Sequence, residues 1–142
     1  MTIDRELVTR KMLLITRDLE QLRAMFPADL NEYLDSLKDQ AMLERYLERM
    51  IGRAIDINFH LITESGGAPP PDYHSSFMRL AEMKVLDREF ASRIARAAGL
   101  RNRLVHEYET IDQRKLYAAG QSALRDIPAY LQQIENFLSR ES

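Results

Sequence analysis

The chain has 142 residues, a length typical of one domain, and we expect a single helical domain over 1–142. The composition, with 45% hydrophobic and 30% charged residues, excludes wholesale disorder. The net charge of −2 argues against binding nucleic acid across the whole surface. The absence of cysteine excludes thiolate metal sites. The sequence has neither an apolar run of membrane length nor the pattern of a signal peptide, so we expect a cytoplasmic protein with no membrane partner.

The first half of the chain has the pattern of amphipathic helices. Apolar residues recur at spacings of three and four, and strand-like alternation is missing. A first helix ends at Pro27, because proline cannot continue a helix, and a second helical region follows Asp29 and extends to Leu61. Glycine and proline cluster between Ser65 and Asp72, which predicts the main loop.

Shorter helices are expected after this loop. Ser75 or Ser76 is predicted to cap a helix around 77–83, and Asp87 is predicted to cap the next one. Gly99 is expected to weaken or end that second helix. This part of the chain therefore predicts two short helices with a break near Gly99.

The last helix has the clearest pattern. Asp112 is expected to cap it, and its apolar residues step by four and three, as in helical bundles. Pro128 lies inside this seam and predicts a kink near Leu124. The sequence as a whole predicts an all-α fold, a bundle of four or five helices with the long helices antiparallel.

One segment of this acidic chain is basic. Between Glu89 and Glu107 there is no acidic residue. The same segment contains four arginines, Arg93, Arg96, Arg101 and Arg103. This pattern predicts a local basic patch that the net charge of the chain conceals.

The end of the basic segment combines residue types suited to phosphodiester chemistry. Arg101 offers a planar fork of donors to phosphate oxygens, and His106 can accept or donate a proton near neutral pH. On an unbroken helix the two side chains would point about 140° apart, so a break beginning at Gly99 would let them converge. The alternative is that both residues only interact with the last carbonyls of a helix.

The motif Arg101-Asn102-x-x-Val105-His106-x-Tyr108 resembles the R-x4-H-x-Y signature of HepT-type HEPN-domain toxins. Segments 47–62 and 77–86 also lie where that family has corresponding helices. The resemblance implies a homodimer in which the paired motifs form a composite ribonuclease site. It implies cleavage of an RNA substrate by 2′-hydroxyl attack without a cofactor, and no cluster of potential metal ligands in the sequence suggests a metal site.

The residues of the motif then have distinct expected roles. His106 would act as general base or acid, and Arg101 would hold the scissile phosphate. Asn102 would position the backbone or bind phosphate. Three further arginines would steer RNA toward the site, Arg93, Arg96 and Arg103. For Arg93 and Arg96 the alternative is a solvated helix face.

Tyr108 has two interpretations. It is either an aromatic residue that packs near the RNA path or the target of a partner protein. In the family that the sequence resembles, the cognate antitoxin is an MntA-type minimal nucleotidyltransferase that adds AMP to the tyrosine of this motif. The added phosphate would repel RNA from the site.

Three other polar residues have less specific predictions. Asp56 lies on an apolar helix, where an unpaired carboxylate is costly, so it would orient Arg101 or His106 or form a buried structural ion pair. His60 is expected to be a packed or capping residue, and His74 a surface residue.

Two other functions remain open. The chain could be a non-catalytic HEPN binding module that serves a nucleotidyltransferase partner. It could also be a purely structural helical dimer, in which the segment around Arg101 only ends a helix.

Overall fold

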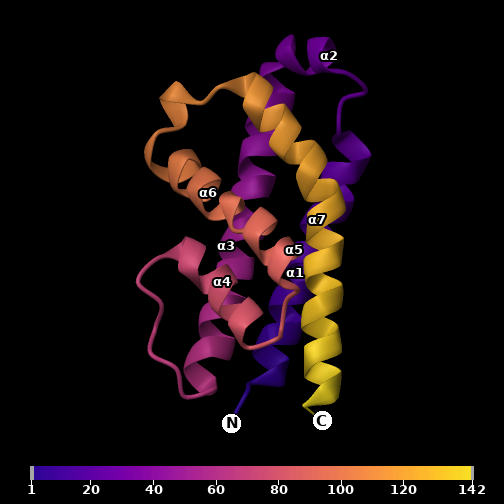
Figure 1. Cartoon of the computed structure of the whole chain (residues 1–142). Coiled ribbons are helices and arrows are strands. Elements are labelled where there is room, and N and C mark those ends of the chain that lie inside the picture. The colour runs from indigo at the N-terminus through magenta and orange to yellow at the C-terminus, as the bar shows by residue number, and fades with distance from the viewer. Residues whose placement is uncertain (1, 142) are drawn as a thin grey trace.

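All the regular secondary structure is helical in the part of the chain that the computed structural model describes, residues 2–141 without the side chain of Tyr108. Three helices are long and four are short (Figure 1). In chain order the elements are α1 (Arg5–Met25), α2 (Leu30–Leu34), α3 (Leu37–Glu64), α4 (Tyr73–Glu82), α5 (Arg88–Ile94), α6 (Arg96–His106), the 3-10 helix η1 (Tyr108–Thr110) and α7 (Gln113–Arg140). The all-helical class predicted from the apolar spacing is confirmed.

The three long helices form the main body of the bundle. The backbone N–H of Asp4, just before α1, donates to His60 Nε2 near the end of α3 at 2.9 Å. Arg5 Nη2 donates to the carbonyl of Leu138 near the end of α7 at 2.7 Å. α1 is therefore antiparallel to α3 and α7, which run in the same direction because α4–α6 return the chain to the level where α3 starts (Figure 1). His60 has the capping type of role that the sequence predicted.

The helix boundaries follow from short-range hydrogen bonds. Asp112 caps α7 as predicted, since its Oδ1 accepts from the backbone N–H of Arg114 at 3.0 Å. Ser36 caps α3 in the same way, because its Oγ accepts from the N–H of Asp39 at 3.1 Å. The helical region predicted to follow Asp29 is therefore divided into α2 and α3.

The two serines that were predicted to cap α4 do not cap it, and one of them belongs to a buried polar network. Asp72 caps this helix by accepting from the N–H of Ser75 at 2.7 Å, so the prediction of a serine cap is wrong. Ser76 is instead buried, and its Oγ accepts from Asn58 Nδ2 of α3 at 3.0 Å. The hydroxyl of Tyr130 on α7 donates to Asn58 Oδ1 at 2.6 Å, and burial raises the pKa of this hydroxyl well above its usual value. The network thus joins α3, α4 and α7 with a hydroxyl that stays protonated.

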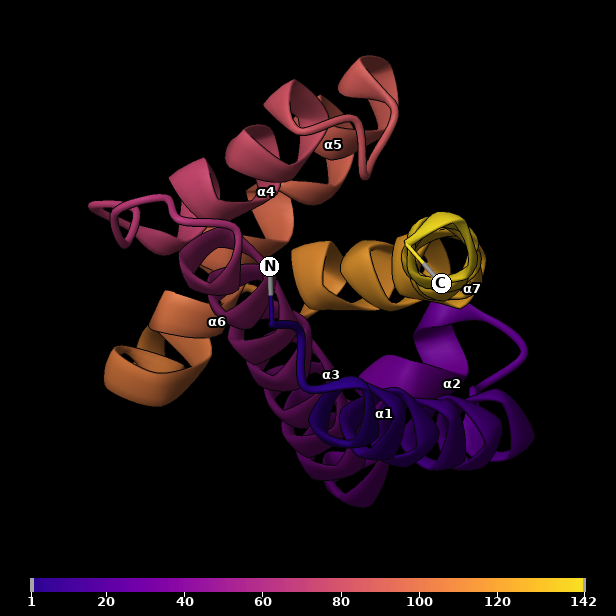
Figure 2. The same cartoon turned by 90° about the horizontal axis from the view of Figure 1, so that it is seen from below.

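α7 bends where the sequence predicted a kink. In Figure 2 its C-terminal half is seen end-on, whereas its N-terminal half lies across the view. Pro128 has no backbone N–H to offer the Leu124 carbonyl, which accepts instead from Arg23 Nη2 of α1 at 3.2 Å. Gly120 allows α7 to approach the end of α1, because a Cβ there would lie 2.8 Å from the ring of Phe26.

Candidate active site

The helix that carries the predicted motif, α6, is continuous. The break in this region falls at Ala95, between α5 and α6, and Gly99 lies inside α6, so the prediction that Gly99 weakens or ends the helix is wrong. Burial of apolar side chains on its inner face offsets the cost of a mid-helix glycine, roughly 1 kcal/mol. Asp87 holds the N-cap position of α5 as predicted, but its side chain makes no capping hydrogen bond.

Arg101 and His106 do not converge within one chain. They are five residues apart on the unbroken α6, so their side chains leave the helix in directions about 140° apart. Arg101 is half-buried, whereas His106 and Asn102 are exposed. One copy of the chain therefore presents a recessed arginine and, on another face of the same helix, an exposed histidine.

A pocket of about 380 Å³ opens beside Arg101. Residues of α1, α3, α4 and α6 form its walls, and α3 packs against the other three helices. The guanidinium carbon of Arg101 lies 5.5 Å from the centroid of the Tyr73 ring of α4. This cation–π contact holds the arginine against one wall of the pocket.

Arg101 lies directly against α3 at Gly52. A Cβ at position 52 would be 3.9 Å from Arg101 Nε. Among the described residues this buried Nε has no hydrogen-bond partner. A buried N–H without a partner costs roughly 1–3 kcal/mol, so the position of this Nε needs a compensating reason.

Asp56 occupies the same pocket but not in the predicted way. It lies on the side of α3 opposite the core, and 57% of its side chain is exposed, so the expected buried position is wrong. Its Oδ2 pairs with Lys11 Nζ of α1 at 3.2 Å. No hydrogen bond joins it to Arg101 or His106 in the described part of the chain.

The other arginines of the basic segment, on α5 and α6, lie away from this pocket. They line a groove of about 660 Å³ between α6 and α7 that also has an apolar floor. These residues are Arg93, Arg96 and Arg103. Arg93 Nη2 pairs with Asp126 Oδ1 of α7 at 3.2 Å, and Glu107 lines the same groove. The acid-free segment of the sequence is therefore not acid-free in space, because α7 brings a carboxylate to it.

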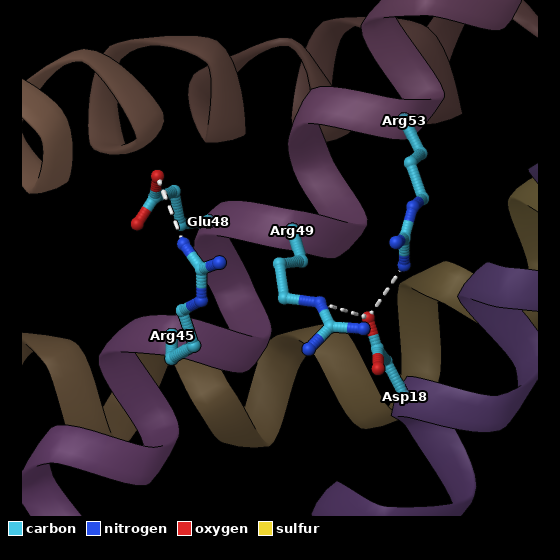
Figure 3. Close-up of polar contacts among 5 residues, drawn as sticks. All are labelled: Asp18, Arg45, Glu48, Arg49 and Arg53. Atoms are coloured by element: carbon cyan, nitrogen blue, oxygen red, sulfur yellow. Dashed lines mark hydrogen bonds and ion pairs between the residues drawn. The ribbon is translucent and has the colours of Figure 1, made fainter.

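A cluster that the sequence analysis missed joins α1 to α3. Figure 3 shows Arg49 and Arg53 of α3 pointing toward Asp18 of α1, which is only 5% exposed. Asp18 Oδ2 accepts from Arg53 Nη1 at 2.8 Å and pairs with Arg49 Nε at 3.2 Å. Beyond it, Arg45 Nη1 pairs with Glu48 at 3.6 Å. The four-residue spacing of the three arginines was the available signal in the sequence. Asp18, the partner of Arg49 and Arg53, is more than 30 residues away in sequence, so the pairing itself could not be predicted.

This cluster supports the pocket beside Arg101. Arg49 lies two helical turns before Asp56, so the two residues share a face of α3 with Gly52. Asp18 lies seven residues after Lys11, on the corresponding face of α1. The two levels of ion pairs follow one another along the α1–α3 contact and fix the distance between two walls of the pocket.

Two other predictions concern metals and Tyr108. Among residues 2–141, no group of three or more histidine, aspartate or glutamate side chains is placed to hold a metal ion. Tyr108 begins η1, which Glu107 separates from the end of α6, and the side chain of Tyr108 lies outside the described residues. None of the described helices is both long and apolar enough to cross a membrane.

Solved structures share this all-helical, HEPN-like fold. The tri-AMPylated HEPN toxin of Shewanella oneidensis, in complex with its MNT antitoxin, matches with a TM-score of 0.83 at 20% identity, over 93% of this chain and 98% of that chain. YutE of Bacillus subtilis, a cytosolic protein of unknown function, matches with a TM-score of 0.81 at 21% identity, over 98% of this chain and 93% of that chain. These similarities establish the fold class.

Sequence comparison establishes the family. The family profile described as "Ribonuclease HepT-like" matches residues 15–134. The "tRNA nuclease HepT" of Aphanizomenon flos-aquae is 35% identical over 136 residues, which cover 96% of this chain and 92% of that protein. The chain therefore belongs to the HepT-like ribonuclease family, and the enzyme class that the motif indicated is confirmed.

Proposed function

We propose that the chain is a metal-independent endoribonuclease toxin whose active site is completed by a second copy of the chain. The observation that supports this most directly is the continuity of α6, which keeps Arg101 and His106 about 140° apart. A twofold dimer would bring two copies of each residue to one interface, where an arginine and two histidines can act on one phosphate. Membership of the HepT-like ribonucleases supports the same reaction class.

In the proposed reaction, the imidazole of one His106 accepts the proton of the RNA 2′-hydroxyl, and the 2′-oxygen attacks the adjacent phosphorus. The bond from phosphorus to the 5′-oxygen breaks, and His106 of the second copy donates a proton to the leaving oxygen. The products are a 2′,3′-cyclic phosphate end and a 5′-hydroxyl end. Arg101 holds the phosphate and stabilises the negative charge that develops on its non-bridging oxygens. No metal or cofactor takes part.

Residues around this pair have supporting roles. Asn102, next to Arg101 and exposed, binds phosphate or positions the backbone. Asp56 contributes to the wall of the Arg101 pocket. Three arginines that line the groove between α6 and α7 attract the RNA strand over a longer distance, Arg93, Arg96 and Arg103.

An MntA-type nucleotidyltransferase antitoxin would silence the enzyme through Tyr108. The phenolic oxygen forms a bond to the α-phosphorus of ATP, and pyrophosphate leaves. Because Tyr108 follows His106 by two residues, the new phosphate would repel the RNA phosphate from the site. The AMPylated state of the Shewanella oneidensis toxin in its antitoxin complex supports this form of control.

The first test compares protein made alone with protein made together with an MntA-type nucleotidyltransferase. Intact-mass analysis should find one or more added AMP groups on Tyr108 only in the co-expressed protein, and only the unmodified protein should cleave RNA. An unmodified dimer that binds the partner tightly but cleaves no RNA would instead support the non-catalytic binding module.

The second test replaces the proposed acid–base residue. His106→Ala should lower the rate of RNA cleavage by at least about a hundredfold, the usual range for a general acid or base, while the protein stays folded and dimeric. The matched control is His74→Ala, because His74 is exposed on α4. Cleavage by His106→Ala at the rate of the control would exclude the proposed mechanism.

A further inference from the structure

The pocket beside Arg101 has walls that suit a nucleobase as well as a phosphate. We propose that it is a base-binding subsite that selects guanine next to the cleaved bond, an inference that rests on the proposed ribonuclease function. Its volume of about 380 Å³ lies within the range of small-molecule sites, roughly 300–1,000 Å³. His106 and Arg101 act on the sugar and phosphate that all nucleotides share, so any base selectivity has to come from other side chains.

The apolar part of the pocket offers a surface for a planar base. Phe59 of α3 and Tyr73 of α4 meet edge to face, with ring centroids 6.1 Å apart. Arg101 already lies over Tyr73, whereas Phe59 is half-buried and lines the pocket together with Leu7 and Ile55. Stacking of an unpaired base on an aromatic side chain is a common and strong element of single-stranded RNA binding.

The polar part of the pocket matches one edge of guanine. Lys11 Nζ and Asp56 Oδ2 are 3.2 Å apart, and their side chains remain 27% and 57% exposed, so both are accessible to a ligand. Guanine has two adjacent donors, N1–H and the N2 amino group, beside the O6 acceptor. The carboxylate of Asp56 can accept from both donors while the ammonium of Lys11 donates to O6.

The other three bases match this pair less well. Adenine, cytosine and uracil each offer the carboxylate only one donor group along the same edge. A carboxylate that accepts two hydrogen bonds from a base is a bidentate contact, which discriminates more strongly than a single bond. The charged groups that line the pocket are Lys11, Arg101 and Asp56, so the site keeps a net positive charge for the phosphate.

The distance between the polar groups suits a single nucleotide. Arg101 lies against Gly52, and Asp56 follows one turn later on the same face of α3, roughly 6 Å along the helix axis. A base held by Asp56 would therefore leave its own phosphate on the Arg101 side of the pocket. The subsite would thus fix which phosphodiester bond reaches His106.

Binding provides a test that does not depend on cleavage. The probes are labelled uridine pentanucleotides with 2′-O-methyl groups, which cannot be cleaved, and a central guanine, adenine, cytosine or uracil. Wild-type protein should bind the guanine probe at least about tenfold more tightly, because it alone makes the bidentate contact. Asp56→Asn should remove this preference, since an amide offers one acceptor in place of two.

The matched control is Asp87→Asn, an exposed aspartate whose side chain makes no capping hydrogen bond, and it should keep the preference of the wild type. Asp56 is on the surface, so circular dichroism should show that both variants fold. Equal affinity of the wild type for all four probes would overturn the subsite. Guanine preference that survives in Asp56→Asn would overturn it as well.

Cleavage gives a second result that separates this inference from the proposed function. Products from a random RNA library should carry guanosine on one side of the cut, and inosine, which lacks the N2 amino group, should lower kcat/KM about fivefold or more. Cleavage that needs Arg101 but has no base preference would overturn the subsite and leave the ribonuclease function intact. Guanine-selective binding without any cleavage would overturn the ribonuclease function and leave the subsite.

Discussion

Arginines in the pocket beside Arg101 and in the groove between α6 and α7 differ in exposure and in their polar partners. In the groove, Arg93 is 56% exposed, pairs with Asp126 and lies over the ring of Phe90. In the pocket, Arg101 is recessed against Gly52, and its buried Nε has no hydrogen-bond partner among the described residues. In the groove, Arg93 therefore has an ion-pair partner at the surface. In the pocket, the buried Nε of Arg101 has no hydrogen-bond partner among the described residues.

This difference shows that the number of positive charges in a segment does not tell how each arginine is held in the fold. The basic segment distributes its arginines to two sides of α6, and the groove side is partly neutralised by α7. A paired surface arginine contributes little to stability. A buried N–H without a partner lowers stability, so the buried Nε of Arg101 has a cost that the proposed function would explain.

Replacing Arg101 and Arg93 in turn by methionine should give the largest difference in the rate of RNA cleavage. Arg101→Met should lower the rate of RNA cleavage by about a hundredfold or more, as for loss of a group that stabilises transition-state charge. The free energy of unfolding should not fall, because the change removes an unsatisfied N–H and methionine still packs on Tyr73. Arg93→Met should keep cleavage within about threefold.

Initial rates on a single-stranded RNA and urea unfolding would measure both effects. A loss of stability in Arg101→Met that matches its loss of activity would mean that the arginine is structural. Equal losses of activity in Arg101→Met and Arg93→Met would remove the contrast between the two regions.

Gly52 gives a smaller and more local way to test the recessed position. Gly52→Leu should lower cleavage about tenfold, because a long side chain would take the space in which Arg101 lies, 3.9 Å from the position of a Cβ. Gly52→Ala is the matched control, since that distance is an ordinary contact and alanine favours a helix by up to about 1 kcal/mol. Thermal unfolding and initial rates should therefore show an active and slightly more stable alanine variant. An active leucine variant would mean that Arg101 does not need this position.

Local features of the fold could be predicted from the sequence because neighbouring residues determine them. Asp112 caps a helix through the backbone three residues ahead, and Pro128 bends α7 because it lacks an N–H. The motif around Arg101 and His106 could be found in the same way, since its residues are close together in the chain. Ala95 could not, because alanine favours helices and nothing beside it indicates the break between α5 and α6.

The walls of the site depend on contacts between distant segments. Arg101 lies against Gly52 and Tyr73, which belong to two other helices, and the burial of its Nε appears only when these helices pack together. The pairing of Asp18 with Arg49 likewise needs α1 and α3 to be in register. Sequence patterns identify the chemical groups, whereas their partners and exposure are set by tertiary packing.

Asp126 provides the smallest expected effect and tests the groove side directly. Asp126→Ala should free Arg93, which is already more than half exposed and can be solvated, so the fold should remain stable. If RNA passes over the groove, one further cation becomes available to a phosphate. The affinity for RNA should then rise about two- to threefold at low salt, and the salt dependence of binding should become steeper by about one counterion.

Fluorescence anisotropy at several salt concentrations would measure both quantities, with the double variant Arg93→Met/Asp126→Ala as the control. The gain should disappear in the double variant, because the freed cation is then absent. An unchanged affinity and slope in Asp126→Ala would mean that RNA does not contact the groove. The proposed role of Arg93 in steering RNA would then be wrong, and the Arg101 side of α6 alone would carry the substrate.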